Sequence, residues 1–318
     1  MKIALDPYMH RHVPLLDLPR FVANLGYEYI ELSPRADFLD WWVNPRTYPE
    51  RTRAFKRALA DAGVKLASLL PMYRWASPHP VERLAAMRYW KAAIRIAVEM
   101  DCDTMNSEFG RGPSPSFASF NACCAGGTTE TCEAAFWDSM DDLVPIFERE
   151  GITLNVEPHP EDFVETLAPA VDMVRSIDSK NVRFLYCAPH NFYFGDDTAS
   201  MIETAAPVLA HVHVADTFNH KASSGLRYIV NPPGSAARVH QHLNIGEGEV
   251  DWDAFFGTLA KVGFDGIMTA CVFAWEEKAE ESSRFMLAEM KRYVAKYWTE
   301  GSPAEVAAQP GHPGPSRP

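Results

Sequence analysis

One pattern recurs along this chain: an amphipathic helix, then a glycine, then a short apolar strand. The glycine is Gly26, Gly63, Gly151 or Gly263, and the segment that follows each of them is rich in Ile, Val and Leu. Glycine at the end of a helix supplies the left-handed turn that begins a helix-to-strand connection. Strands with little polar alternation are typical of parallel strands covered on both faces. The pattern therefore predicts an α/β fold built on a parallel sheet.

The strand-and-helix units number eight. The expected strands lie near residues 2–6, 27–32, 64–70, 103–108, 152–157, 182–187, 209–215 and 266–272. The expected helices lie near residues 14–25, 48–62, 80–100, 133–150, 164–176, 197–207, 251–262 and 277–297. Eight units that close on a helix match a single (β/α)8 barrel, or TIM barrel, rather than a doubly wound sheet.

We expect residues 1–299 to form one TIM-barrel catalytic domain, followed by a disordered Pro/Gly-rich tail at 300–318. Two long loops are expected, at 109–132 after the fourth strand and at 217–249 after the seventh. Loops that follow barrel strands lie on the face where these folds carry their active sites.

Composition excludes several kinds of partner. The net charge is −12, from 42 acidic and 30 basic residues, and no Lys/Arg stripe is interleaved with aromatic residues. Such a chain repels phosphate groups, so we expect neither nucleic acid nor an anionic membrane as a partner. The absence of a long apolar run and of a secretory segment favours a cytoplasmic protein. The six cysteines lack CxxC spacing, which argues against a disulfide framework.

Histidines and a glutamate gather where three neighbouring strands end. Glu157 and His159 share a parity at the end of the fifth strand, His190 follows the sixth, and His213 lies near the end of the seventh. Side chains at the carboxyl ends of barrel strands reach the active-site face. Carboxylate plus imidazole is a ligand set for Mn, Zn, Fe or Co. The sequence therefore predicts a divalent-metal site, although a lone histidine would more often bond only a buried partner.

A metal ion bound to a ketone oxygen would acidify the neighbouring C–H bond of a ketone substrate. Histidine is suited to remove that proton near neutral pH, and we interpret His159 as the base, with Glu108 as a second catalytic candidate. Contacts to substrate are expected from side chains that follow the strands, with packing or loop anchoring as the alternative for each: Tyr8, Trp75, Asn106, Arg238, His240, His242 and Phe273.

Over about residues 1–297 the chain resembles the xylose-isomerase-like TIM barrels of the sugar phosphate isomerase/epimerase superfamily. The resemblance implies metal ligands Glu, Asp, His and Glu at the ends of strands five to eight. It also implies a substrate-binding His three residues after the Asp. Glu157, His190 and His213 match this pattern, as does the segment GEGEVDW at 246–252.

Two positions depart from that family pattern. The family Asp aligns with Cys187, and the Glu of the last strand aligns with Cys271. Either the thiols are ligands and the site prefers Zn²⁺, or the site has shifted onto His159 and His190, or metal binding is lost. We favour the shift, because the two histidines supply donors without any cysteine, and we then expect one Mn²⁺ ion.

The segments NVEPHPEDFVET, FLYCAPHNFYFG, FNHKASSGLRYIVNPPG and MTACVFAWEE are most similar to inositol-catabolism H-type proteins and to the α subunits of bacterial 3-oxo-C-glycoside deglycosidases. This resemblance implies a keto sugar or 3-oxo-glycoside as substrate and a small β-sandwich partner subunit, with a homo-oligomer as another assembly. The favoured function is a 3-oxo-glycoside lyase that abstracts the C2 proton and then eliminates the group at C1. The alternatives are a keto-sugar or keto-inositol isomerase/epimerase and a non-catalytic sugar-binding barrel. An abasic-site endonuclease on the same fold is disfavoured by the negative charge and by the few metal-type carboxylates.

Overall fold

The computed structural model describes residues 1–39, 49–110, 112, 127–194, 197–219 and 241–298. Eight parallel strands form a closed barrel in chain order, which confirms the expected fold. The strands are β1 (Lys2–Leu5), β2 (Tyr29–Leu32), β3 (Lys65–Leu69), β4 (Thr104–Glu108), β5 (Thr153–Glu157), β6 (Val182–Cys187), β7 (Leu209–Val214) and β8 (Ile267–Ala270). The barrel closes between its last and first strands, where Ile267 pairs with Lys2 and Ala270 with Leu5.

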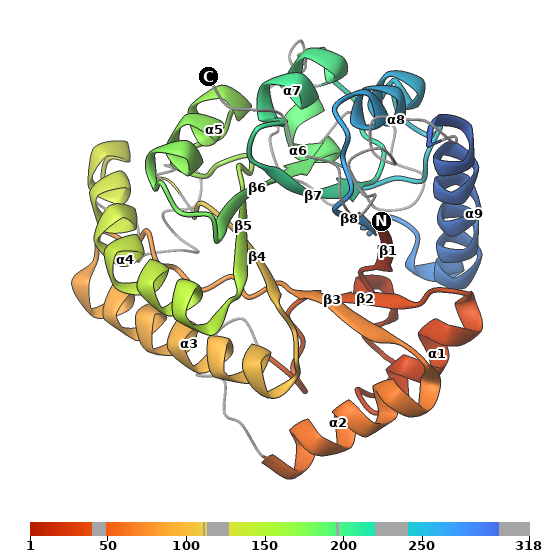
Figure 1. Cartoon of the computed structure of the whole chain (residues 1–318), viewed down its shortest axis with the longest axis horizontal. Coiled ribbons are helices and arrows are strands. Elements are labelled where there is room, and N and C mark those ends of the chain that lie inside the picture. The colour runs from red at the N-terminus through yellow and green to blue at the C-terminus, as the bar shows by residue number, and fades with distance from the viewer. Residues whose placement is uncertain (40–48, 111, 113–126, 195–196, 220–240, 299–318) are drawn as a thin grey trace, which may run out of the picture.

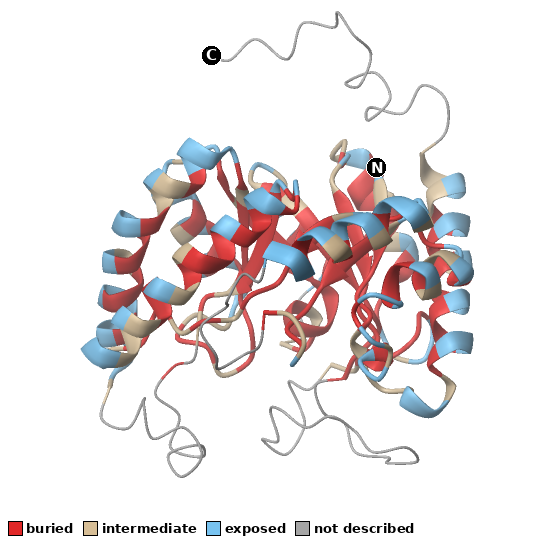
Figure 2. Ribbon diagram, turned by 90° about the horizontal axis from the view of Figure 1, so that it is seen from below, coloured by how far each residue is buried: buried red, intermediate tan, exposed pale blue. Residues whose placement is uncertain are grey.

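Helices surround this barrel on the outside (Figure 1). They are α1 (Leu18–Leu25), α2 (Pro49–Ala62), α3 (Pro80–Glu99), α4 (Thr129–Glu150), α5 (Leu167–Ser176), α6 (Ala188–Phe192), α7 (Thr198–Ala205), α8 (Trp252–Lys261) and α9 (Ala279–Tyr297), with short 3-10 turns at Tyr8–His10 and Glu276–Lys278. Figure 2 shows the strands buried and the outward faces of the helices exposed. Within the described ranges, none of the helices combines the length and the apolar character that a membrane span requires.

The glycines of the repeated pattern adopt the expected left-handed conformation. The φ angles of Gly26 and Gly151 are 96° and 69°, and each residue ends a helix. Gly63 and Gly263 have φ angles of 69° and 73°. Residues with a side chain rarely adopt this conformation, so the four glycines set the points where the chain turns back toward the barrel.

Helix boundaries differ from expectation where local hydrogen bonds decide them. Helix α4 begins at Thr129, earlier than expected, because the Thr128 hydroxyl accepts from the backbone N–H of Thr131 in a capping box. Helix α1 begins only at Leu18, since the preceding residues form a turn on the carbonyl of Pro14. The short helix α6, directly after β6, was not expected at all.

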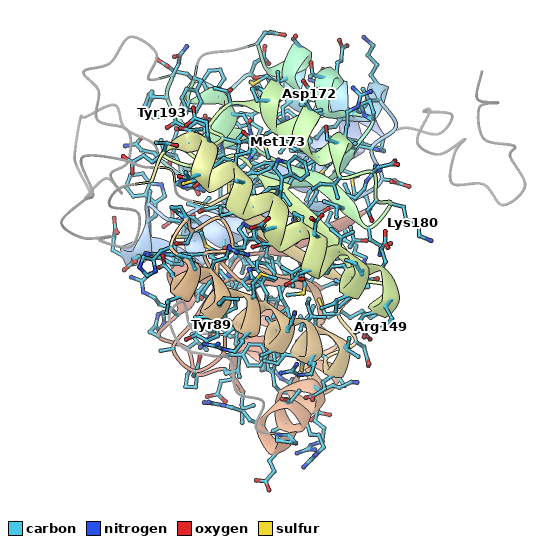
Figure 3. All side chains as sticks on the ribbon, turned by 90° about the vertical axis from the view of Figure 1, so that its left-hand side faces the viewer. Tyr89, Arg149, Asp172, Met173, Lys180 and Tyr193 are labelled. Atoms are coloured by element: carbon cyan, nitrogen blue, oxygen red, sulfur yellow. The ribbon has the colours of Figure 1, made fainter. Side chains whose placement is uncertain are left out.

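The two ends of the barrel differ in which side chains they carry. In Figure 3, Lys180, just before β6, and Tyr193, shortly after that strand, lie at opposite ends of the molecule. Because all strands are parallel, their carboxyl ends meet at the end that carries Tyr193. Both long connections, after β4 and after β7, start from this end, although most of each lies outside the described residues. The segment 300–318 also lies outside them.

Side chains alternate between the outside of the barrel and its interior. Val212 and Val214 of β7 belong to the main apolar core, whereas the preceding His211 shares a hydrogen bond with Thr269 on β8. The strands thus pack apolar residues against the helices and point polar residues inward. A polar layer therefore fills the barrel below its carboxyl-terminal mouth.

Candidate metal centre and active site

The predicted ligand residues Glu157, His190 and His213 meet at the mouth of the barrel. Oε2 of Glu157 lies 3.1 Å from Nδ1 of His190 and 3.5 Å from Nδ1 of His213, and all three side chains are buried. Burial alone would raise the pKa of Glu157, but His213 and His190 hold it well below its ordinary value. Oε2 accepts no well-oriented hydrogen bond from the described residues. A buried carboxylate oxygen of this kind is suited to bind a cation.

Cys187 and Cys271 lie beside the same histidine. Ligand atoms of Cys187, His213 and Cys271 fall within 4.8 Å of one another, and both cysteines are fully buried. Cys187 ends β6 and Cys271 directly follows β8, the two strands that flank β7. Both are free cysteines, placed to share an ion with His213 and not joined in a disulfide.

Electrostatics favours one thiolate in this pair. Burial raises the pKa of Cys187 well above its ordinary value, helped by its hydrogen bond to Cys271 and by the charge of Glu157. Burial also opposes ionisation of Cys271, but the hydrogen bond from Cys187 and the neighbouring His242 and His213 lower its pKa. Thiolate is the form of cysteine that binds metal ions.

His159 belongs to a different group of side chains. Its Nε2 lies 3.7 Å from Oε1 of Glu108, and these two residues together with Asp162 place ligand atoms within 4.8 Å of one another. Its Nδ1 lies 2.7 Å from the carbonyl oxygen of Pro160. Because a carbonyl only accepts, Nδ1 carries the hydrogen and Nε2 is the basic nitrogen. The two predicted catalytic residues are thus adjacent.

The two histidines of the expected shifted metal site, His159 and His190, belong to different groups of candidate ligands. His159 lies with Glu108 and Asp162 instead of with Glu157 and His213. Its ring does contact that of His190, at a centroid distance of 4.3 Å, so the two groups are neighbours.

Aromatic and imidazole rings also lie at the mouth. His242 stacks on Phe273 at 4.4 Å, and Phe273 contacts Tyr8 at 4.7 Å between ring centroids. His242 also lies 5.3 Å from the ring of His190. Its orientation is held by the carbonyl of Cys271, 2.7 Å from Nδ1. These three predicted substrate contacts therefore stand next to the candidate ligands.

The other predicted substrate contacts lie elsewhere. Trp75 is only 1% exposed and stacks on Trp90 at 4.3 Å, so the packing role accounts for it. Its indole N–H donates to the carbonyl of Phe109, which satisfies the polar atom of a core side chain. Asn106 is fully buried beneath the mouth and bonds protein side chains. Arg238 and His240 lie outside the described residues.

The sequence analysis missed Glu31 of β2. This carboxylate is fully buried and approaches His213 from below, with Oε1 2.7 Å from Nε2 of the ring. Burial would raise the pKa of Glu31, but His213 and His211 hold it at about 2. For His213 itself, burial opposes protonation, yet Glu31 and Glu157 raise its pKa well above the ordinary value. An acidic residue inside the short apolar strand YIEL was the signal that pointed to a buried role.

The carboxyl group of Asp6, next to this layer, ionises less readily than that of Glu31. Burial, and then the charge of Glu31, raise its pKa to about 7. Its Oδ1 accepts hydrogen bonds from the hydroxyl of Ser33 at 2.6 Å and from the backbone N–H of Tyr8 at 3.0 Å. Two carboxyl groups in one dry interior do not both ionise readily, so Glu31 keeps the charge.

Together these features form a candidate divalent-metal site beside the His159–Glu108 pair at the mouth of an α/β barrel. The chain belongs to the xylose isomerase-like TIM barrel family, whose model matches residues 19–289. This confirms the family resemblance seen in the sequence.

Individual relatives are distant. An inosose isomerase of Bacillus licheniformis is 24% identical over 174 residues, which cover 53% of this chain and 58% of that protein. The match thus spans little more than half the length of that relative. A zinc-bound structure of the IOLI protein superimposes with a TM-score of 0.71 at 16% identity, covering 93% of this chain and 99% of that one. The 3-keto-D-glucoside 4-epimerase of E. coli gives a TM-score of 0.69 at 18% identity, with coverage of 92% and 99%. At such identities the two structures show a shared fold.

Proposed function

We propose that this protein is a metal-dependent enzyme that removes the proton next to the ketone of a keto sugar. The observation that carries this proposal is the pairing of His159 with Glu108 beside a buried group of metal-type ligands. The inosose isomerase and the 3-keto-D-glucoside 4-epimerase among its relatives support a substrate of this class.

We assign the ion to Cys187, His213, Cys271 and the adjacent Glu157. The donor set fits a metal, because Oε2 of Glu157 is buried without a well-oriented donor among the described residues and the thiols converge on His213. Two sulfur donors and one imidazole favour zinc over manganese. When bound, the ion would supply Lewis-acid stabilisation of the negative charge that develops on the ketone oxygen.

His159 supplies the base. The substrate C–H proton passes to Nε2, the electron pair of that bond forms a C=C bond, and the carbonyl electrons move onto oxygen. The imidazolium that results lies beside the Glu108 carboxylate, whose negative charge stabilises it. The bond from Nδ1 to Pro160 keeps Nε2 as the reacting nitrogen throughout.

The fate of the enolised sugar decides the reaction class. Return of the proton gives an isomer or epimer, and the two relatives that are named an isomerase and an epimerase support this outcome as the first assignment. In β-elimination the electron pair of the enolised sugar instead forms a C1=C2 double bond, and the group at C1 leaves with the electron pair of its bond to C1. The segments shared with 3-oxo-C-glycoside deglycosidases support this lyase reaction, together with a small β-sandwich partner subunit, as the second assignment.

The test uses the full chain with zinc and a 3-oxo-glucoside in deuterated water. C2 deuterium exchange is followed by NMR, and release of the aglycone is followed by chromatography. His159→Ala should still bind zinc. Its rate of C2 exchange should fall by roughly 10²–10⁴-fold, which is the usual contribution of a positioned acid–base group. The exposed His12→Ala is the matched control and should exchange like wild type.

Each result has a definite meaning. Removal of the ion with a chelator should abolish exchange in all variants. Exchange followed by an epimer marks an isomerase/epimerase, and exchange with aglycone release marks the lyase. Exchange at the wild-type rate in His159→Ala, or loss of zinc from that variant, would show that His159 is not the base. A wild type without exchange on any 3-oxo sugar contradicts the proposed function and favours a binding barrel.

A further inference from the structure

A second buried carboxylate, Glu31, takes no part in the proton transfer and holds no ion in the scheme above. It lies on the side of His213 that faces away from Glu157. Oε1 of Glu31 is 2.7 Å from Nε2 of His213, whereas Oε2 of Glu157 is 3.5 Å from Nδ1 of the same ring. The two nitrogens of one imidazole therefore face two different carboxylates.

We propose that Glu31 is a positioning residue that fixes the tautomer and ring orientation of His213, so that Nδ1 is presented to the ion. A carboxylate only accepts hydrogen bonds, so the single hydrogen of a neutral His213 must sit on Nε2. The lone pair that a metal needs is then on Nδ1, toward Glu157. This inference rests on the proposed function, because it takes His213 as a metal ligand.

The competing role for Glu31 is that of a ligand, since Glu31, His211 and His213 also place ligand atoms within 4.8 Å of one another. Its second oxygen argues against that role. Oε2 accepts hydrogen bonds from the hydroxyl of Ser68, at 2.5 Å, and from the side-chain amide of Asn106. An ion at this oxygen would displace both donors and leave them buried without partners, which is costly.

A chain of bonds across the barrel holds Glu31 in this orientation. Nδ2 of Asn155 donates to Oδ1 of Asn106 at 2.8 Å, so the amide of Asn106 must turn its own Nδ2 toward Glu31. Asn155, Asn106 and Ser68 come from β5, β4 and β3, three consecutive strands. The carboxylate is thus held by the rigid wall of the barrel, a position from which it can orient His213.

Glu31→Gln tests the proposal with almost no change in shape. The donors Ser68 and Asn106 still require an acceptor, so the new amide oxygen should stay with them and the amide NH2 should face His213. Nε2 must then accept, the hydrogen moves to Nδ1, and that nitrogen can no longer bind an ion without a tautomer change. We expect zinc affinity to fall by about 10–100-fold, as for other contacts that orient a metal-binding histidine.

Zinc affinity is measured by competition with an absorbing chelator on the full chain. Cobalt substituted for zinc gives a visible spectrum that reports ligand geometry, and this spectrum should change in Glu31→Gln. The matched control is Asp216→Asn, which alters another fully buried carboxylate that bonds the loop after β7, at Gly246, Val250 and Trp252. It should reduce stability but leave zinc affinity and the cobalt spectrum unchanged.

Should Glu31→Gln not fold, the wild type still decides the matter. Two-bond 1H–15N correlation spectra of the zinc-loaded protein should show His213 with hydrogen on Nε2 and metal on Nδ1; metal on Nε2 overturns the proposal. Unchanged zinc affinity in a folded Glu31→Gln also overturns it. A wild type that binds no zinc refutes this inference and the metal assignment together, whereas tight wild-type binding with an unaffected variant refutes this inference alone.

Discussion

His213 lies between two carboxylates that resemble each other in burial and differ in their bonding. Glu31 of β2 and Glu157 of β5 are both nearly inaccessible, and neighbouring histidines lower the pKa of both. Glu31 accepts bonds from Ser68 and Asn106 on one oxygen and from His213 on the other. Oε2 of Glu157 has no well-oriented donor within the described part of the chain.

The comparison shows that burial and charge alone do not distinguish a carboxylate suited to bind a metal ion from one suited to orient a metal-binding histidine. A buried carboxylate oxygen without a donor carries a desolvation cost that a cation would offset. An oxygen that is already saturated with donors gains nothing from a cation and serves best as a fixed acceptor. The donors around each oxygen are therefore the basis on which we propose Glu157 as the metal ligand and Glu31 as the residue that orients His213.

The largest effect should follow from Glu157→Gln. This change removes a proposed ligand, so zinc affinity should fall by more than the roughly 10–100-fold expected for an orienting contact. The stability of the metal-free protein should fall less than in Glu31→Gln, because the altered oxygen makes no well-oriented hydrogen bond among the described residues. Chelator competition and urea unfolding of both variants measure the two quantities.

The opposite order of effects contradicts this assignment. If Glu31→Gln lost more zinc than Glu157→Gln, Glu31 would be the ligand and the unsatisfied oxygen of Glu157 would need another explanation.

A pH-dependent effect should follow from Asp6→Asn, next to Glu31. The pKa of Asp6 is about 7 in the folded chain, whereas its ordinary value is 3.8. Between these two pH values the folded state therefore binds a proton that the unfolded state has released. The contribution of Asp6 to the free energy of unfolding should therefore fall as pH rises from about 4 to 7, by on the order of 1–4 kcal/mol. Asp6→Asn removes this contribution, so its stability relative to wild type should increase over that window.

Urea unfolding of metal-free wild type and Asp6→Asn at the two ends of this pH range checks the sign. A stability difference that stays constant with pH would mean that Asp6 is ionised in the fold and that Glu31 is not the only charged carboxylate on the β2 side.

The smallest effect should follow from Ser68→Ala, which removes one donor to Glu31. A hydrogen bond to a charged group typically contributes about 1.5–3 kcal/mol, and thermal unfolding should show a loss of this size. Ser139→Ala is the matched control, since this buried serine donates to the neutral carbonyl of Trp75 and should cost about 0.5–1.5 kcal/mol. Equal losses in the two variants would argue that Glu31 is not held as a charged acceptor.

Much of the barrel could be predicted because its signals are local. The left-handed glycines mark the turns before strands, and the apolar runs mark the strands themselves, so all eight strands lie where expected. Helix α6 was missed because its five residues, which include Pro189 and His190, are too few for a periodic pattern. The early start of α4 depends on one side-chain bond of Thr128, which a hydrophobic pattern does not reveal.

The candidate site was predicted in part. Strand parity placed Glu157 and His213 at the mouth, because alternation along a strand is a local property. It did not show that His159 would pair with Glu108, or that Trp75 would turn into the core against Trp90. Those outcomes depend on which neighbouring element lies within reach after the barrel closes.

By itself the sequence determined the parallel barrel, the face that carries the chemistry, and most of the side chains that point into its mouth. Only the tertiary structure decided which of these side chains meet. The thiols of Cys187 and Cys271 approach His213, and Glu31 of β2 contacts Nε2 of the same ring. The physical reason is distance along the chain. Residues 31 and 213 are brought together by closure of the barrel, and no periodicity within either strand specifies that contact.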